Sequence, residues 1–127
     1  MLSKTNGIIS MTPGADHSEK EGHFVNGSAG KPVVCAAATD KPIGVLLDGE
    51  ATTGKDTVAL CGATSGTCLV KLGGAATKLS HGELVAGGTV KNDTGAGARI
   101  LCCTFLEDGV EGELVEAAII TPIVIAA

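Results

Sequence analysis

Aromatic residues are almost absent from this chain of 127 residues. It has no tryptophan, no tyrosine and only two phenylalanines, Phe24 and Phe105, although 44% of its residues are hydrophobic. The core must therefore be built mainly from alanine, valine, isoleucine and leucine, which bury less apolar area per residue than aromatic side chains do. We expect a monomer of modest stability that gains further stability from assembly.

Clusters of basic residues are also missing. Fourteen acidic residues stand against nine basic ones, which gives a formal net charge of −5, and no run of lysine or arginine occurs anywhere. A protein that binds nucleic acid needs clustered positive charge to displace counterions from the phosphates. The charge pattern therefore excludes nucleic acid as a direct ligand.

Long apolar runs are absent as well. The N-terminal residues lack the apolar core of a signal peptide. The longest apolar stretch, 117–127, has 11 residues and contains Thr121 and Pro122, whereas a membrane-spanning helix needs about 20. We therefore expect a protein that is made in the cytoplasm and has no membrane partner. The β-branched residues of this stretch favour a final buried strand.

The spacing of cysteines and histidines argues against a catalytic or metal site. Cys61 and Cys68 are separated by six residues, and His17 and His23 by five, so neither pair has a zinc-binding spacing. His81 lies in a Ser-His-Gly turn, and no local pattern joins a nucleophile to a base. We predict no catalytic residue, no cofactor and no metal, and hence a protein that is not an enzyme.

The cysteines themselves favour a reduced, buried state. Their number is odd, and most of them lie in apolar, strand-like runs, as is typical of small buried hydrophobic residues in a protein without disulfides. The five are Cys35, Cys61, Cys68, Cys102 and Cys103.

Two segments partly match the sequence patterns of functional loops. Residues 49–56 satisfy the GxxxxGK pattern of a phosphate-binding loop, but Asp56 stands where that loop has Ser or Thr, and residues 57–60 favour a strand instead of a helix. Residues 38–42 resemble the turn on which lipoyl carriers display a lysine, but Pro42 follows Lys41 directly. We interpret the first as a hairpin loop and the second as the entry to a strand.

The body of the chain has the pattern of an all-β, glycine-rich domain. From Gly22 onward, short β-rich runs alternate with Gly, Asp and Asn turns at intervals of about 8–12 residues, which indicates a barrel or sandwich. Turns are predicted at Asn26-Gly27, Asp48-Gly49 and Asp108-Gly109, among others. Strands are predicted over 22–25, 32–37, 43–47, 57–61, 67–72, 83–85, 89–91, 99–106 and 113–124.

Residues 1–21 differ from this body. They are polar and without periodicity, so they predict an extended N-terminal arm that becomes ordered in an assembly, while 22–127 form the β-barrel domain. Within that domain, residues 43–59 and 101–117 repeat each other weakly, since each is an apolar strand, an Asp-Gly turn and a charged entry into a second strand. Such hairpins could pair around a closed barrel.

From Gly30 onward the chain resembles the small capsid decoration proteins of tailed bacteriophages, also called capsid cement proteins. In that family a Pro-Ile-Gly-Val strand follows a strand that opens with Gly-Lys, and a Gly-Glu-Leu-Val-Glu strand comes last. The residues that carry the resemblance are Gly30-Lys31-Pro32-Val33-Val34, 40–48, Gly54-Lys55-Asp56-Thr57-Val58, His81-Gly82-Glu83-Leu84-Val85, 106–109 and Gly112-Glu113-Leu114-Val115-Glu116.

The resemblance implies a β-barrel or β-tulip body, commonly a homotrimer, bound to the outside of a maturing phage head near its three-fold axes. The implied partner is the major capsid protein, and the implied location is the exterior of the virion. The predicted contacts with the shell or between subunits are apolar residues of the two terminal segments, namely Leu2, Ile8, Ile9, Met11, Ile119, Ile120, Ile123 and Ile125.

Two other classes remain open. The chain could be an oligomeric β-module of a tail appendage, a host-attachment protein or a carrier, or it could be an enzyme. Binding to phage heads separates the decoration protein from the β-module, whereas an activity that depends on one Cys or His would indicate an enzyme.

Overall fold

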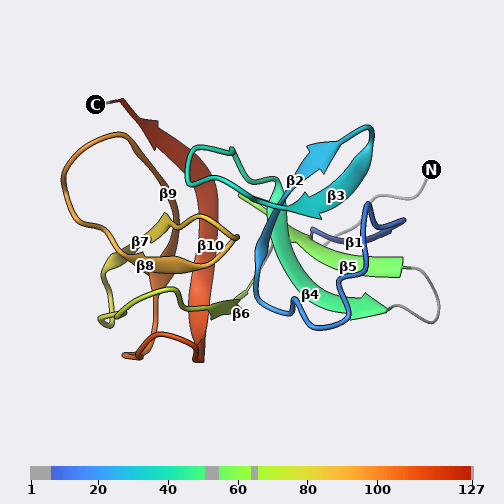
Figure 1. The fold of residues 1–127 in the computed structure, drawn as a ribbon. Coiled ribbons are helices and arrows are strands. Elements are labelled where there is room, and N and C mark those ends of the chain that lie inside the picture. Colours follow the sequence, from blue (N-terminus) through green and yellow to red (C-terminus); the bar gives the residue numbers. More distant parts are fainter. Residues whose placement is uncertain (1–6, 51–54, 64–65, 127) are drawn as a thin grey trace.

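Two antiparallel β-sheets make up the fold (Figure 1). The structure is a computed structural model that describes residues 7–50, 55–63 and 66–126. The all-β prediction is confirmed, because the described residues contain strands and turns but no helix, and hence no helix that could span a membrane. The strands within these ranges are β1 (Ile8–Met11), β2 (Phe24–Ser28), β3 (Lys31–Val34), β4 (Gly44–Glu50), β5 (Lys55–Leu60), β6 (Cys68–Lys71), β7 (His81–Leu84), β8 (Val90–Asn92), β9 (Arg99–Phe105) and β10 (Leu114–Ile125).

The two halves of the chain have the same strand topology. The N-terminal sheet has the order β1-β5-β4-β2-β3 and the C-terminal sheet the order β6-β10-β9-β7-β8, which is the same order when each half is counted from its own first strand. The two hairpins that repeat in sequence are β4–β5 and β9–β10, and they occupy equivalent places. They lie in different sheets, so the expectation that they pair with each other around one closed barrel is not met.

One hydrophobic core lies between the sheets. Its buried members come from both halves of the chain and include the two phenylalanines, Phe24 on β2 and Phe105 on β9, both fully buried. Side chains alternate between the two faces of a strand. Val45 and Ala59 of the N-terminal sheet therefore face this core, while their neighbours Leu46 and Val58 point to the opposite face of the sheet.

The outer face of the N-terminal sheet carries a second, smaller cluster. Val25, Leu46 and Val58 are fully buried there, and Met11 packs against them. The chain between β1 and β2 runs over this face. At one point of that segment, the Gly14 N–H donates to the Pro32 carbonyl at 2.9 Å. The N-terminal sheet is thus buried on both faces, whereas antiparallel sheets commonly leave one face to solvent.

The buried contact between His17 and Asp56 ties the segment between β1 and β2 to the sheet. His17 Nδ1 lies 2.6 Å from Asp56 Oδ2, and the two residues are only 4% and 1% exposed. Asp56 precedes Val58 by two residues on β5, so both side chains point to the outer face. The other carboxylate oxygen, Asp56 Oδ1, is buried without a hydrogen-bond partner among the described residues.

These contacts correct the expectation of a separate arm over residues 1–21. Ile8–Met11 form the edge strand β1, which pairs with β5 from Ile8↔Ala59 to Met11↔Asp56, and residues 12–21 carry the buried His17. Residues 7–21 therefore belong to the β-body. Residues 1–6 lie outside the described part of the chain.

The remaining strands follow the prediction with shifted turns. Asn26-Gly27 was predicted as a turn but lies within β2, and the β2–β3 hairpin turns instead at Ala29 and Gly30, whose φ angles are 54° and 78°. Two positive φ angles in a two-residue loop match the twist of the flanking strands. Similarly, Asp48-Gly49 lies inside β4 and not in a turn.

Candidate functional site

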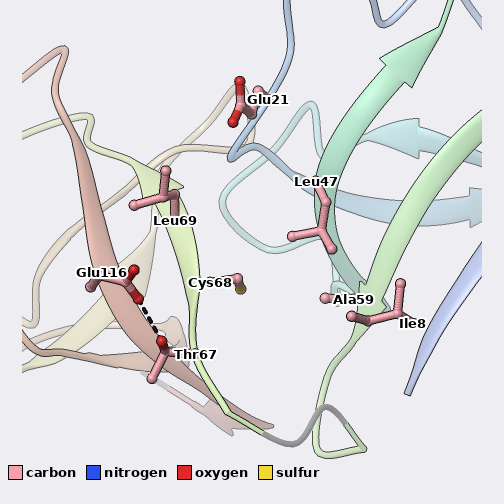
Figure 2. Close-up of a pocket in the computed structure, with 8 residues that line it drawn as sticks. All are labelled: Ile8, Glu21, Leu47, Ala59, Thr67, Cys68, Leu69 and Glu116. Atoms are coloured by element: carbon pink, nitrogen blue, oxygen red, sulfur yellow. Dashed lines mark hydrogen bonds between the residues drawn. The ribbon is translucent and has the colours of Figure 1, made fainter. Parts of the chain in front are cut away.

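A cleft of about 230 Å³ opens between the two sheets (Figure 2). Strands β1, β4 and β5 of the N-terminal sheet form the apolar wall of the cleft. Edge strand β6 and its neighbour β10 form the other wall. The lining residues are Ile8, Glu21, Leu47, Ala59, Thr67, Cys68, Leu69 and Glu116.

Next to the cleft, the backbone of Gly22 is hydrogen-bonded to both sheets. Its N–H donates to the Leu46 carbonyl at 2.8 Å, and its carbonyl accepts from the Lys71 N–H at 2.9 Å. The φ angle of Gly22 is +81°, and an added Cβ would lie 2.5 Å from Leu114 Cδ2 and 2.8 Å from the Lys71 nitrogen. Only glycine fits here without strain. The position of Glu21 is set by this bridge, because Glu21 immediately precedes it.

Glu116 on β10 also lines the cleft and is fixed by two hydrogen bonds. Its Oε2 accepts from the Thr67 hydroxyl at 2.5 Å, and its backbone N–H donates to Glu107 Oε1 at 2.7 Å. Glu116 lies opposite Leu69 in the β6–β10 ladder, so both residues lie on the same face of this pair. In Figure 2, Glu21 and Glu116 lie apart, and strand β6 runs between Glu116 and the apolar side chains of Leu47, Ala59 and Ile8.

The thiol in the cleft is not an activated nucleophile. Burial, together with Cys103 and Glu116, raises the pKa of Cys68 to about 11, so the thiol stays protonated at neutral pH. None of the histidines of the described chain lines the cleft. They have other partners, since His17 contacts Asp56, His23 Nδ1 contacts the Lys20 carbonyl, and His81 Nδ1 contacts the Thr104 hydroxyl. The groups of the cleft suit binding better than covalent catalysis.

The remaining thiols are also held in their protonated form. Burial raises the pKa of Cys35 and of Cys61 to about 12. Cys35, Cys68, Cys102 and Cys103 belong to the core between the sheets, and the partly buried Cys61 packs against it. All five cysteines are free, as the sequence predicted. Across the described ranges, no group of three or more His, Cys, Asp or Glu side chains is placed to hold a metal ion.

The two loop motifs of the sequence have structural roles. Lys55–Leu60 form strand β5 directly after the GxxxxGK pattern, so no helix N-terminus is available to bind a phosphate there, and residues 51–54 of the loop lie outside the described chain. The segment before Lys41 is a turn in which the Ala37 N–H donates to Asp40 Oδ2 at 3.0 Å, and Pro42 is buried.

Comparisons with known proteins do not assign this site. No family model matches the chain, and no curated protein sequence is similar to it. The geometry of the cleft and of the surface therefore carries the functional argument.

The structure separates the predicted contact residues into different environments. Ile119 is buried in the core, only 8% exposed, so the prediction that it contacts another molecule does not hold for this residue. Met11 packs into the outer cluster and Ile8 lines the cleft. Leu2 lies outside the described residues. Ile9, Ile120 and Ile125 are half-buried, and Ile123 is 49% exposed.

Sequence reasoning missed Glu21, Glu116 and Val124. Val124 is 61% exposed, more than any predicted contact residue that the structure describes. Strict alternation along β10 would have assigned one face of the strand to the core, but both Ile123 and Val124 are exposed at its end. No local signal relates Glu21 to Glu116, because only the packing of the two sheets brings them to one cleft.

Proposed function

We propose that this protein is a structural virion protein that binds the outer surface of a tailed-phage capsid and stabilises the shell. The observation that carries the proposal is the exposed, apolar C-terminal end of β10, where Ile123 and Val124 are 49% and 61% exposed. Exposed apolar residues next to each other are typical of surfaces that contact another protein. The resemblance of the sequence to capsid decoration proteins supplies the kind of partner.

The backbone of the same segment is also available for pairing. β6 pairs with β10 only from Leu114 to Ala117, and beyond Ala117 no strand of the described chain pairs with β10 on the side away from β9. Figure 1 shows this end of β10 running past the shorter strands of its sheet. An unpaired apolar edge favours contact with a second chain.

Assembly on a lattice requires no chemistry from the protein. A protein that binds the assembled shell but not its dispersed subunits stabilises the shell by mass action. Several weak contacts made at once by a homotrimer add up to tight attachment. The small-aliphatic core, in which Phe24 and Phe105 are the aromatic members, agrees with a subunit that gains stability from such contacts.

The test uses a double variant, Ile123→Lys with Val124→Lys. Charges on the exposed end of β10 are expected to lower the fraction of trimer seen in sedimentation velocity. They should also lower the amount of protein that co-sediments with expanded heads of the phage that encodes it. The matched control is Leu79→Lys with Val110→Lys, because Leu79 and Val110 are also exposed, by 71% and 63%, but lie elsewhere. Equal head binding by wild type and by the β10 variant contradicts this role of β10. A trimer that binds no head favours the β-module of a tail or attachment protein.

A further inference from the structure

We propose that residues 12–21 form a cover that opens as a unit while the two sheets stay folded, and that the contact between His17 and Asp56 controls this opening. The inference goes beyond capsid binding and does not depend on it. It rests on a comparison within the chain, because the two sheets share one strand order and each has a segment between its first and second strands. We call residues 12–21 the cover segment and residues 72–80 its counterpart.

Backbone hydrogen bonds show which residues of the two sheets correspond. The Leu46 N–H on β4 donates to the carbonyl of His23, the residue just before β2. The Phe105 N–H on β9 donates to the carbonyl of Ser80, the residue just before β7. Since β4 and β9 hold equivalent places in their sheets, as do β2 and β7, Leu46 corresponds to Phe105.

The same correspondence matches Asp56 with Val115. The strand partners of the two corresponding residues are Val58 on β5 and Ala117 on β10. Two residues earlier on the same strands stand Asp56 and Val115, which are 1% and 4% exposed. An apolar core residue therefore takes the place of the carboxylate in the C-terminal sheet, so this strand arrangement does not itself require a polar contact there.

The two segments are fastened in different ways. Leu72 and Ala76 of the counterpart are buried in the core, and Ala76 and Gly109 exchange two backbone hydrogen bonds of 3.0 Å. In the cover segment, His17 is the buried residue, Pro13 is half-buried and the rest are exposed. The cover segment therefore depends on one polar side chain, whereas its counterpart is held by apolar burial and by backbone pairing.

Opening of the cover segment uncovers apolar side chains without breaking a strand. Val25, Leu46 and Val58 form the fully buried outer cluster of the N-terminal sheet. None of the residues 12–21 takes part in a strand pair, so all ladders of the described sheets persist when the segment moves. The bond from the Gly14 N–H to the Pro32 carbonyl, of 2.9 Å, is broken.

Asp56 itself favours release. Its Oδ2 lies 2.6 Å from His17 Nδ1, but its Oδ1 is buried without a hydrogen-bond partner among the described residues. A buried polar atom without a partner costs free energy that water would recover. Hydration of this oxygen offsets part of the cost of exposing the outer cluster, which makes local opening cheaper than global unfolding.

Native-state hydrogen exchange of the full chain tests the proposal. The Gly14 amide reports closure of the cover segment, because it donates to the Pro32 carbonyl. The Ala76 amide reports the counterpart in the same molecule, because it donates to the Gly109 carbonyl. In the wild type, the protection factor of Gly14 should be at least about ten-fold lower than that of Ala76.

Two variants separate the His17 contact from the rest of the fold. In His17→Ala the Gly14 amide should lose its protection, whereas Ala76 stays protected and a hydrophobic dye, 8-anilinonaphthalene-1-sulfonate, binds the uncovered cluster. His17→Leu with Asp56→Leu supplies an apolar contact, as in the counterpart, and should keep Gly14 protected and the dye unbound.

Val70→Ala is the matched control, because it opens a cavity in the core between the sheets and leaves the cover segment intact. It should keep the protection of Gly14 and bind no dye. Equal protection of Gly14 and Ala76 in the wild type, retained protection of Gly14 in His17→Ala, or loss of protection at Gly14 and Ala76 together in that variant would each overturn the proposal. The wild-type comparison decides the matter if His17→Ala does not fold.

Discussion

At the scale of single residues, the buried pair of His17 and Asp56 has the largest energetic consequence. Removing one partner of a buried ion pair leaves the other charge uncompensated, which costs about 3–5 kcal/mol. Asp56 already has one buried oxygen without a partner among the described residues, so it has little capacity to adapt. We therefore expect His17→Ala to lower the free energy of unfolding by about this amount in urea denaturation.

Two further variants separate charge from packing at this site. His23→Ala removes a histidine that is half-buried and contacts only backbone carbonyls, and it should cost no more than about 1 kcal/mol. His17→Leu combined with Asp56→Leu removes both buried polar side chains, so it should recover most of the stability that His17→Ala loses. If the double variant loses as much stability as His17→Ala does, the pair stabilises the fold through packing and not through its polar contact.

The thiols predict how stability depends on alkaline pH. The pKa is raised from about 9 to about 12 for Cys35 and Cys61, and to about 11 for Cys68, mainly by burial. Ionisation is therefore easier in the unfolded chain, so the native state loses stability as the pH rises from 9 towards 12. Urea midpoints measured across this range should fall less steeply in the variant with alanine at all three positions.

Thiol labelling checks the same burial at neutral pH. The native protein should react slowly with a thiol reagent, and all five cysteines should react after denaturation. This part of the core was accessible to sequence reasoning because most of the cysteines lie in apolar runs. The cleft was not accessible, since only the packing of the two sheets brings Glu21 and Glu116 to its lining.

At the scale of secondary-structure elements, β1 changes what a truncation should do. Deleting residues 1–21 removes an edge strand that pairs with β5 and also removes His17. The truncated protein should lose at least the roughly 3–5 kcal/mol expected when buried Asp56 loses its partner His17, and its midpoint in urea should fall accordingly. Deleting residues 1–6 keeps β1 and His17 and provides the control. Equal stability of both truncations would mean that β1 contributes nothing to the body.

The strand pattern was predictable where apolar residues and turns alternate clearly. All strands after residue 22 were expected near their observed places, because valine, isoleucine and leucine recur between glycine-rich turns. β1 was missed because Ile8-Ile9-Ser10-Met11 is short and flanked by polar residues, so its pairing with β5 is a tertiary contact without a local signal. The β2–β3 turn was misplaced since Asn26-Gly27 is a stronger turn signal than Ala29-Gly30.

At the scale of the whole molecule, Gly22 links the two sheets through its backbone. An alanine there would adopt φ +81° and place its Cβ 2.8 Å from the Lys71 nitrogen. We expect Gly22→Ala to destabilise the protein by about 2–4 kcal/mol, from backbone strain and overpacking together. Gly27→Ala is the matched control, because no atom lies within 4 Å of its Cβ position, and thermal unfolding of the two variants compares them.

The shared strand order of the two sheets has a consequence for how the molecule can be taken apart. Every strand pairs only with strands of its own half, so each sheet is a contiguous piece of chain, joined to the other between β5 and β6. The halves meet through side chains of the core and a few backbone bonds such as those of Gly22. A cut within residues 61–67 breaks no strand pairing of the described chain. Two separately produced fragments, 1–63 and 66–127, should therefore reconstitute the fold by complementation when mixed, with a 15N spectrum of the labelled fragment that matches the intact protein.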